Sequence, residues 1–262
     1  MESDLDLNHT SSSYVEALDE FRKVGDVYQV YNKMYDQVKN LDHVTHVIAI
    51  GAGPAIDEIA FMKKLTPYLS RFTAVDMNEW CMEELRQSVK KYLPSDVILD
   101  VHLTKLQDWQ GPSEAADLVF MFHSLYYFND DERKNIYEAC FKKWLKPNGK
   151  LFVKIIKDLH EAKAPHYLND IYRETGRKLL TEAFTIKQEL QNLGYKIDEE
   201  LEYIYYQDLS ILNNSVVSFI KLEAKPSFDD DETVRNVLKK LHAEGNKGYS
   251  SGALFSVVNE KF

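Results

Sequence analysis

Five short runs of apolar residues recur along the chain, each bounded by polar or turn-forming residues. Such runs are typical of strands that are buried on both faces of a parallel sheet. They predict parallel strands over residues 47–50, 72–76, 97–103, 117–122 and 151–156. Between them, apolar residues return every three or four positions, which indicates amphipathic helices that pack on both faces of the sheet.

The flanking regions extend this pattern. Apolar stripes at helical spacing before residue 43 predict an N-terminal helical cap that is interrupted at Gly25 and Asp26. A helical stretch follows the fifth strand, in two pieces broken near Gly176, and Asp230 and its acidic neighbours cap a further helix. β-Rich residues at 201–206 and 216–222 predict a final antiparallel pair.

The predicted fold is therefore α/β, an open seven-stranded sheet that is mostly parallel. We expect three regions: a cap over residues 1–42 that contributes to a substrate pocket, a cofactor-binding domain over 43–224, and a C-terminal helix and tail over 225–262. The tail is rich in glycine and serine before an apolar run, which suits a lid or a docked segment.

Composition narrows the classes of partner. The 262 residues carry a formal net charge of -10, which argues against nucleic acid because phosphate binding needs a basic surface. Two cysteines, Cys81 and Cys140, are too few for a disulfide framework. No apolar run is long enough to span a bilayer, and residues 1–13 lack the apolar core of a signal peptide. We expect a cytoplasmic monomer that acts on a small molecule.

The first strand leads into the candidate chemistry. It ends at Gly51-Ala52-Gly53, and a helix follows, so backbone can approach a ligand closely where no Cβ intervenes. The second strand ends at Asp76, the position from which an acid reaches a ribose hydroxyl in a doubly wound sheet. Ile56 stands where dinucleotide-binding enzymes need a third glycine, and the loop has no P-loop lysine, so the pattern favours a nucleoside without a pyrophosphate.

These pieces resemble the class I S-adenosylmethionine-dependent methyltransferases. The likeness spans roughly residues 44–224 and keeps the order of the family's motifs: the glycine turn, Asp76, the strand from Asp117 to Val119 with Tyr126-Tyr127-Phe128 after it, and the turn from Leu145 to Leu151. The resemblance implies S-adenosylmethionine as cofactor. It implies that the cofactor contacts Gly51, Ala52, Gly53, Asp76, Met77, Lys105, Leu106, Phe122 and His123.

A narrower likeness is to the histamine N-methyltransferase group. It rests on the stretch from Ser13 to Glu16, on residues 122–127 (Phe-His-Ser-Leu-Tyr-Tyr) and on residues 192–194 (Asn-Leu-Gly). It implies methyl transfer to a nitrogen of a small amine or imidazole. In that group an N-terminal tyrosine and an acid help to form the amine pocket, and these roles would fall on Tyr14 and, with a one-residue gap, Asp26. The end of the fourth strand adds His123, Tyr126 and Tyr127 as substrate-binding candidates.

The chain departs from that group at several positions. His123 replaces the glutamine before Leu-Tyr-Tyr, Ala55 replaces the last glycine of the loop, and the tryptophans after the fifth strand have no counterpart among His160, His166 and Tyr167. Because of these changes, the resemblance does not identify the molecule that accepts the methyl group. A phenol or carboxylate oxygen is an alternative acceptor, and a cofactor-binding protein without turnover is an alternative class.

The catalytic candidates follow from the chemistry. Methyl transfer from a sulfonium needs mainly alignment of the reacting atoms, and an amine attacks only when it is neutral. The fourth strand ends where the methyl group should lie, which makes His123 and Tyr127 the candidates. His43 and His46 lack partners at metal-ligand spacing, and we expect no metal site. If Tyr126 and Tyr127 continue the strand, they point to opposite faces.

Overall fold

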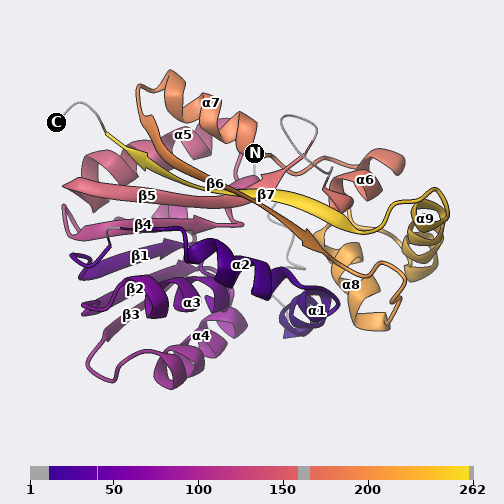
Figure 1. The fold of residues 1–262 in the computed structure, drawn as a ribbon, viewed down its shortest axis with the longest axis horizontal. Helices are drawn as coiled ribbons and strands as arrows, with labels where there is room; N and C mark the ends of the chain where they lie inside the picture. The colour runs from indigo at the N-terminus through magenta and orange to yellow at the C-terminus, as the bar shows by residue number, and fades with distance from the viewer. Residues whose placement is uncertain (1–11, 40, 159–165, 260–262) are drawn as a thin grey trace.

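The computed structural model describes residues 12–39, 41–158 and 166–259. Within this part of the chain one sheet has the strand order β3-β2-β1-β4-β5-β7-β6 (Figure 1). Strands β1 to β5 pair in parallel, whereas β7 pairs antiparallel with both β5 and β6. The strands are β1 His46–Ile50, β2 Arg71–Asp76, β3 Ile98–Leu103, β4 Ala116–Phe122, β5 Leu145–Lys157, β6 Lys196–Tyr206 and β7 Tyr249–Val258. The predicted α/β fold, mostly parallel with an antiparallel final pair, is confirmed.

Helices cover both faces of the sheet. One apolar cluster joins the sheet to helices α1 to α4, α6, α8 and α9, and a second joins it to α5, η4 and α7. In Figure 1, α3 and α4 lie on one side of the strands and α7 on the other. The helices are α1 Ser12–Lys23, α2 Val27–Tyr35, α3 Ile56–Leu65, α4 Glu79–Tyr92, α5 Asp130–Ala139, α6 Tyr167–Glu174, α7 Ala183–Asn192, α8 Asn214–Glu223 and α9 Asp231–Ala243, with single turns η2 Leu106–Asp108, η3 Leu125–Tyr127 and η4 Cys140–Trp144.

Local signals in the sequence explain where these elements begin. Every residue of β1 is buried, as the uncharged run predicts for a central strand. The Asn78 side chain accepts a hydrogen bond from the Cys81 N–H at the start of α4. At the start of α5, Asn129 and Glu132 form a reciprocal capping box, and three acidic residues occupy the first turn, where the helix dipole favours them.

The structure corrects the second of the two final strands. Residues 216–222 do not form a strand but lie in helix α8. Asn213 caps this helix by accepting the Val216 N–H at 2.8 Å, and Val216, Phe219 and Ile220 bury one helical face. The run of β-branched residues was misleading because packing overrides the weak intrinsic preference for strands.

The true partner of β6 is β7, which comes from the segment expected to be a lid or docked tail. Its small residues let β6 approach, because a Cβ at Gly252 would lie 2.3 Å from the ring of Tyr203. Strand β5 also begins earlier than expected. Leu145 already pairs with Ala116, so the expected turn at Leu145–Leu151 lies inside an irregular start of β5.

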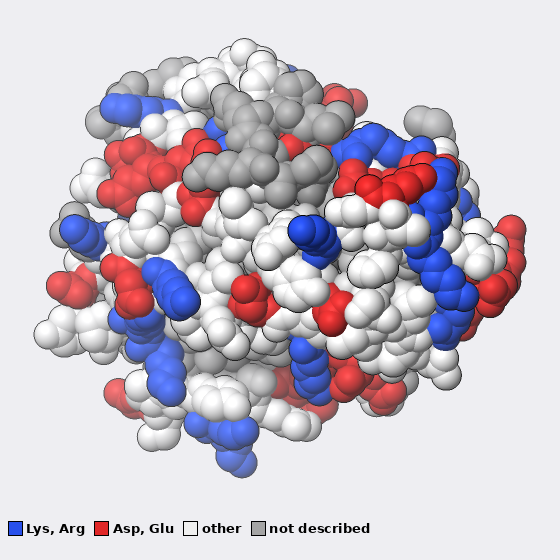
Figure 2. Space-filling view, turned by 45° about the vertical axis from the view of Figure 1, so that its right-hand side comes forward, with Lys and Arg blue, Asp and Glu red and all other residues white. Residues whose placement is uncertain are grey.

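Some predictions fall outside the described residues, namely those on residues 1–11 of the cap and on His160. None of the helices in the described ranges combines the length and the apolar character needed to cross a bilayer. In Figure 2 acidic and basic side chains are interspersed over the face that is shown.

Candidate functional site

A cavity of about 230 Å³ opens at the carboxyl ends of the parallel strands, where the strand order reverses between β1 and β4. Helix α1, the glycine turn, η2, η3 and α8 all contribute to its lining. Ligands of open α/β sheets bind at this switch in strand order. With one exception, the predicted site residues line this cavity: Tyr14, Gly51, Ala52, Gly53, Asp76, Met77, Lys105, Leu106, Phe122, His123, Tyr126 and Tyr127.

The glycine turn exposes backbone to the cavity. Gly51 and Gly53 have φ values of 62° and 52°, in the left-handed region that favours glycine. A Cβ at Gly53 would meet no atom within 4 Å, so the space beside this backbone is open. Ala55 adopts the same region, with φ of 52°, immediately before α3. A non-glycine residue in this conformation is uncommon. Ala55 is the residue that replaces the last glycine of the loop in the histamine N-methyltransferase group.

Asp76 lies beside the turn at the end of β2. Its carboxylate accepts the Gly53 N–H and the Asn78 N–H, both at 2.8 Å, which fixes its position. Burial raises the pKa of Asp76 above its ordinary value. Each carboxylate oxygen can accept more than one hydrogen bond, so the side chain retains acceptor capacity toward the cavity.

Charged side chains of both signs line the same cavity near the turn. Asp57 and Glu58 come from the first turn of α3, and Arg22 comes from α1. Burial alone would lower the pKa of Arg22, but Tyr28 and Asp57 together with other nearby groups raise it. This arrangement suits a zwitterionic amino-acid group, with its carboxylate toward Arg22 and its ammonium toward Asp57.

The residues present therefore fit S-adenosylmethionine, the cofactor that the sequence resemblance implies. Asp76 can accept the ribose hydroxyls, Leu106 and Phe122 offer apolar surface for the adenine, and Arg22 with Asp57 can hold the amino-acid tail. When bound, this cofactor supplies a methyl group that is already activated on a sulfonium.

A buried acid lies in the aromatic part of the cavity. Glu223, the last residue of α8, is 3% exposed. It accepts the Tyr127 hydroxyl at 2.9 Å and the Tyr14 hydroxyl at 3.1 Å. Burial raises the pKa values of Tyr14 and Tyr127, and the charge of Glu223 adds to this, so both phenols stay protonated and donate. This carboxylate is thus held by two donors inside an aromatic wall.

Tyr126 and Tyr127 do not continue the strand. They lie in the turn η3, because β4 ends at Phe122, and both line the cavity with ring centroids 4.7 Å apart. The expectation that the two tyrosines point to opposite faces applied strand geometry to a helical turn and was wrong.

His123 connects the end of β4 to a buried lysine. Its φ is 53°, its N–H donates to the Lys154 carbonyl at 2.7 Å, and its Nε2 lies 3.0 Å from the Tyr31 hydroxyl. The Nζ atom of Lys154 lies 3.6 Å from the centre of the Tyr31 ring and 2.8 Å from the Asp57 carboxylate. Burial lowers the pKa of His123 well below its ordinary value, and the positive charge of Lys154 lowers it further. His123 is therefore a neutral imidazole at physiological pH.

Asp26 is the exception among the predicted site residues. It does not line the cavity, and its carboxylate accepts the Tyr206 N–H at 2.8 Å, which joins the α1–α2 connection to the end of β6. Sequence reasoning missed Arg22, Glu223 and His166, which do line it. No motif spacing marks these three, since they reach the cavity only through tertiary packing. No group of three or more His, Cys, Asp or Glu in the described ranges has a metal-binding arrangement.

Comparison with known proteins assigns the chemistry. Residues 47–149 match a protein family described as a methyltransferase domain. Comparison with curated proteins finds no significant match. Among solved structures, the chain is similar to YjhP from E. coli at 14% identity and to the cyclopropane synthase MmaA2 from Mycobacterium tuberculosis at 11%, each with a TM-score of 0.60. These matches cover 95% of this chain, and 100% and 95% of those chains.

The mitomycin 7-O-methyltransferase MmcR is similar over 74% of this chain and 55% of its own, at 17% identity and a TM-score of 0.56. At these identities the structural likeness shows the fold, and the family match over 47–149 adds the activity. Residues 47–149 therefore resemble a methyltransferase domain, and S-adenosylmethionine is the methyl donor that this likeness implies.

Proposed function

We propose that this protein transfers the methyl group of S-adenosylmethionine to a nitrogen of a small amine or imidazole. The observation that carries the proposal is the carboxylate of Glu223, buried in a cavity wall rich in tyrosine. A carboxylate in a site of low dielectric attracts a cation more strongly than it would in water. The faces of Tyr126 and Tyr127 favour cations as well.

In this reaction Glu223 and His123 would have different roles. Glu223 draws the protonated amine out of water and can take its proton, because the nitrogen attacks only when its lone pair is free. The neutral His123 can accept a hydrogen bond from the incoming nitrogen without repelling the sulfonium. In the transfer the N–CH₃ bond forms as the S–CH₃ bond breaks, and the proton of the amine leaves to a base or to water. Alignment of these groups in the enclosed cavity supplies the rate.

Two measurements test the proposal. Isothermal titration should detect binding of S-adenosylmethionine and of its demethylated product. A labelled-donor assay against matched panels of amines, imidazoles, phenols and carboxylates should then show methylation of the nitrogen acceptors. Methylation confined to phenols or carboxylates, or cofactor binding without any product, would contradict the proposal.

Substitution at the buried acid gives a sharper result. We expect Glu223→Gln to lower kcat/KM for amines at least tenfold and to leave cofactor affinity unchanged, because the amide keeps the shape but loses the charge. The exposed Glu244, at the end of α9, serves as the matched control. A Glu223→Gln enzyme with unchanged kcat/KM for amines would remove Glu223 from the acceptor site.

We further propose a cytoplasmic monomer that has neither nucleic acid nor membrane as partner. The formal net charge of -10 supports this for nucleic acid, because phosphate binding needs a basic surface. Size-exclusion chromatography with light scattering checks the oligomeric state.

A further inference from the structure

Two buried polar atoms in the wall of the cavity have no hydrogen-bond partner among residues 12–39, 41–158 and 166–259. They are Nδ1 of His166 and Oε1 of Gln207. Both side chains line the cavity, and both are 2% exposed. Buried polar groups are nearly always paired, so an unpaired one in a cavity wall calls for an explanation.

Both side chains are held in place through their other polar atom. His166 Nε2 lies 2.9 Å from the Tyr205 hydroxyl, and Gln207 Nε2 donates to the Phe21 carbonyl at 2.8 Å. Burial lowers the pKa of His166 to about 3, so its ring is uncharged at neutral pH. The unpaired atoms are therefore fixed, neutral hydrogen-bonding positions: an acceptor at Gln207, and at His166 a nitrogen whose role depends on the tautomer.

An aromatic wall leads from Glu223 to this pair. Tyr14, which donates to Glu223, has its ring 5.9 Å from that of Phe219, and the Phe219 ring stacks on Phe21 at 4.2 Å. The series continues from Phe21 to Tyr167 at 5.6 Å and from Tyr167 to His166 at 4.9 Å. All of these residues line the same cavity, so a charged site and an uncharged polar site are joined by apolar surface.

We infer that His166 Nδ1 and Gln207 Oε1 form a subsite for an uncharged hydrogen-bonding group of the methyl acceptor, such as an azole N–H, an amide or a hydroxyl. The inference rests on the proposed function. It narrows the acceptor class to two-ended molecules, with a cationic nitrogen at Glu223 and a neutral polar head at the far end of the aromatic wall. A molecule with a purely apolar head would leave both atoms unpaired, and this costs binding free energy.

Equilibrium binding tests the subsite independently of turnover. The full chain is saturated with the demethylated cofactor and titrated with two amines of equal chain length, one ending in an imidazole ring and one in a phenyl ring. We expect the imidazole amine to bind at least tenfold more tightly. His166→Phe and Gln207→Met should each reduce that ratio to within threefold of unity, with cofactor affinity unchanged as proof of folding.

Ser256→Ala is the matched control. Ser256 Oγ is also buried and without a partner in the described part of the chain, but it does not line the cavity, so the ratio should stay unchanged. Equal affinity of the native chain for the two amines overturns the subsite, and so does an unchanged ratio in both folded variants. A binding preference without methylation of either amine would retain the subsite and overturn only the proposed function.

Discussion

A single carboxylate, that of Asp76, holds the glycine turn and faces the cavity at the same time. It fixes Gly53 and Asn78 through their N–H groups and keeps lone pairs for a ligand. We expect Asp76→Ala to weaken binding of S-adenosylmethionine by about 1–3 kcal/mol, because a charge-assisted hydrogen bond is lost. Isothermal titration checks this, with Asp100→Ala on the neighbouring β3 as a control outside the cavity. Unchanged affinity would exclude the ribose role.

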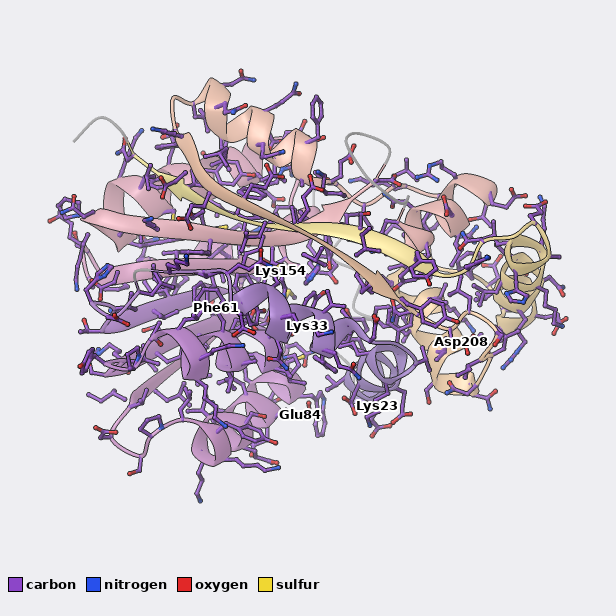
Figure 3. All side chains as sticks on the ribbon, viewed as in Figure 1. Lys23, Lys33, Phe61, Glu84, Lys154 and Asp208 are labelled. Atoms are coloured by element: carbon purple, nitrogen blue, oxygen red, sulfur yellow. The ribbon has the colours of Figure 1, made fainter. Side chains whose placement is uncertain are left out.

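The side chain of Lys154 on β5, which is labelled in Figure 3, is fully buried. It pairs with Asp57 at 2.8 Å and donates to the Tyr35 hydroxyl at 3.0 Å. We expect Lys154→Met to lower the free energy of unfolding by about 3–5 kcal/mol, because it leaves the Asp57 carboxylate buried without its partner. Lys150→Met, on the same strand but with a more exposed ion pair to Asp198, should cost only about 0–1 kcal/mol. Urea denaturation distinguishes the two, and equal losses would contradict this account.

At the scale of the element, strand β7 depends on the absence of a side chain at Gly252. A Cβ there would lie 2.3 Å from Cζ and Oη of Tyr203, whose ring is buried. We expect Gly252→Ala to destabilise the fold by about 1–3 kcal/mol through overpacking. Ser256→Ala on the same strand should be neutral or stabilising, since its hydroxyl has no partner among the described residues. Thermal unfolding measures both, and a neutral Gly252→Ala would show that Tyr203 can move aside.

The elements also show what sequence patterns can predict. The central strands and the helices between them carry strong periodicity and clear caps, so residues 47–50 and 117–122 were placed within a residue of the observed strands. Helix α8 was missed because Val216 and Val217 favour strands locally, while the contacts that make the segment helical come from α1. Long-range packing of this kind leaves no local signal.

At the scale of the whole molecule, the lack of a local signal for long-range packing also explains which residues of the site could be predicted. The glycine turn and Asp76 were predictable because one strand–turn–helix unit and the strand after it place them. Glu223, Arg22 and Gln207 reach the cavity from the two ends of the chain, and only the assembled fold brings them together. The N-terminal helices and the C-terminal third thus complete the lining of the cavity, and sequence patterns predicted this part of the lining least well.

Buried acids near the cavity also couple stability to pH. Burial raises the pKa of Glu58 from 4.5 to about 8, and the negative charge of Asp57 adds to this effect. Between these values the unfolded chain loses this proton and the folded protein keeps it, so the contribution of Glu58 to stability falls as pH rises from 4.5 to about 8. The loss is at most about 1.4 kcal/mol per pH unit.

Glu58→Gln removes this titration. Urea denaturation at pH 5.5 and 7.5 should therefore show that the variant loses less stability than the native chain as pH rises. Other groups titrate equally in both proteins. The difference between the two proteins in how far the free energy of unfolding falls from pH 5.5 to 7.5 therefore comes from Glu58. Parallel slopes would contradict a protonated Glu58 in the folded protein.

The position of β7 between β5 and β6 has a consequence for biosynthesis. Strand β6 leaves the ribosome before β7, and α8 and α9 are made in the interval. Until β7 has emerged, β6, which carries Tyr205 of the cavity lining, has no neighbour in the sheet. A nascent chain arrested after α9 should thus display an open sheet edge to chaperones, and competence to bind the methyl acceptor should arise only in the final stage of translation.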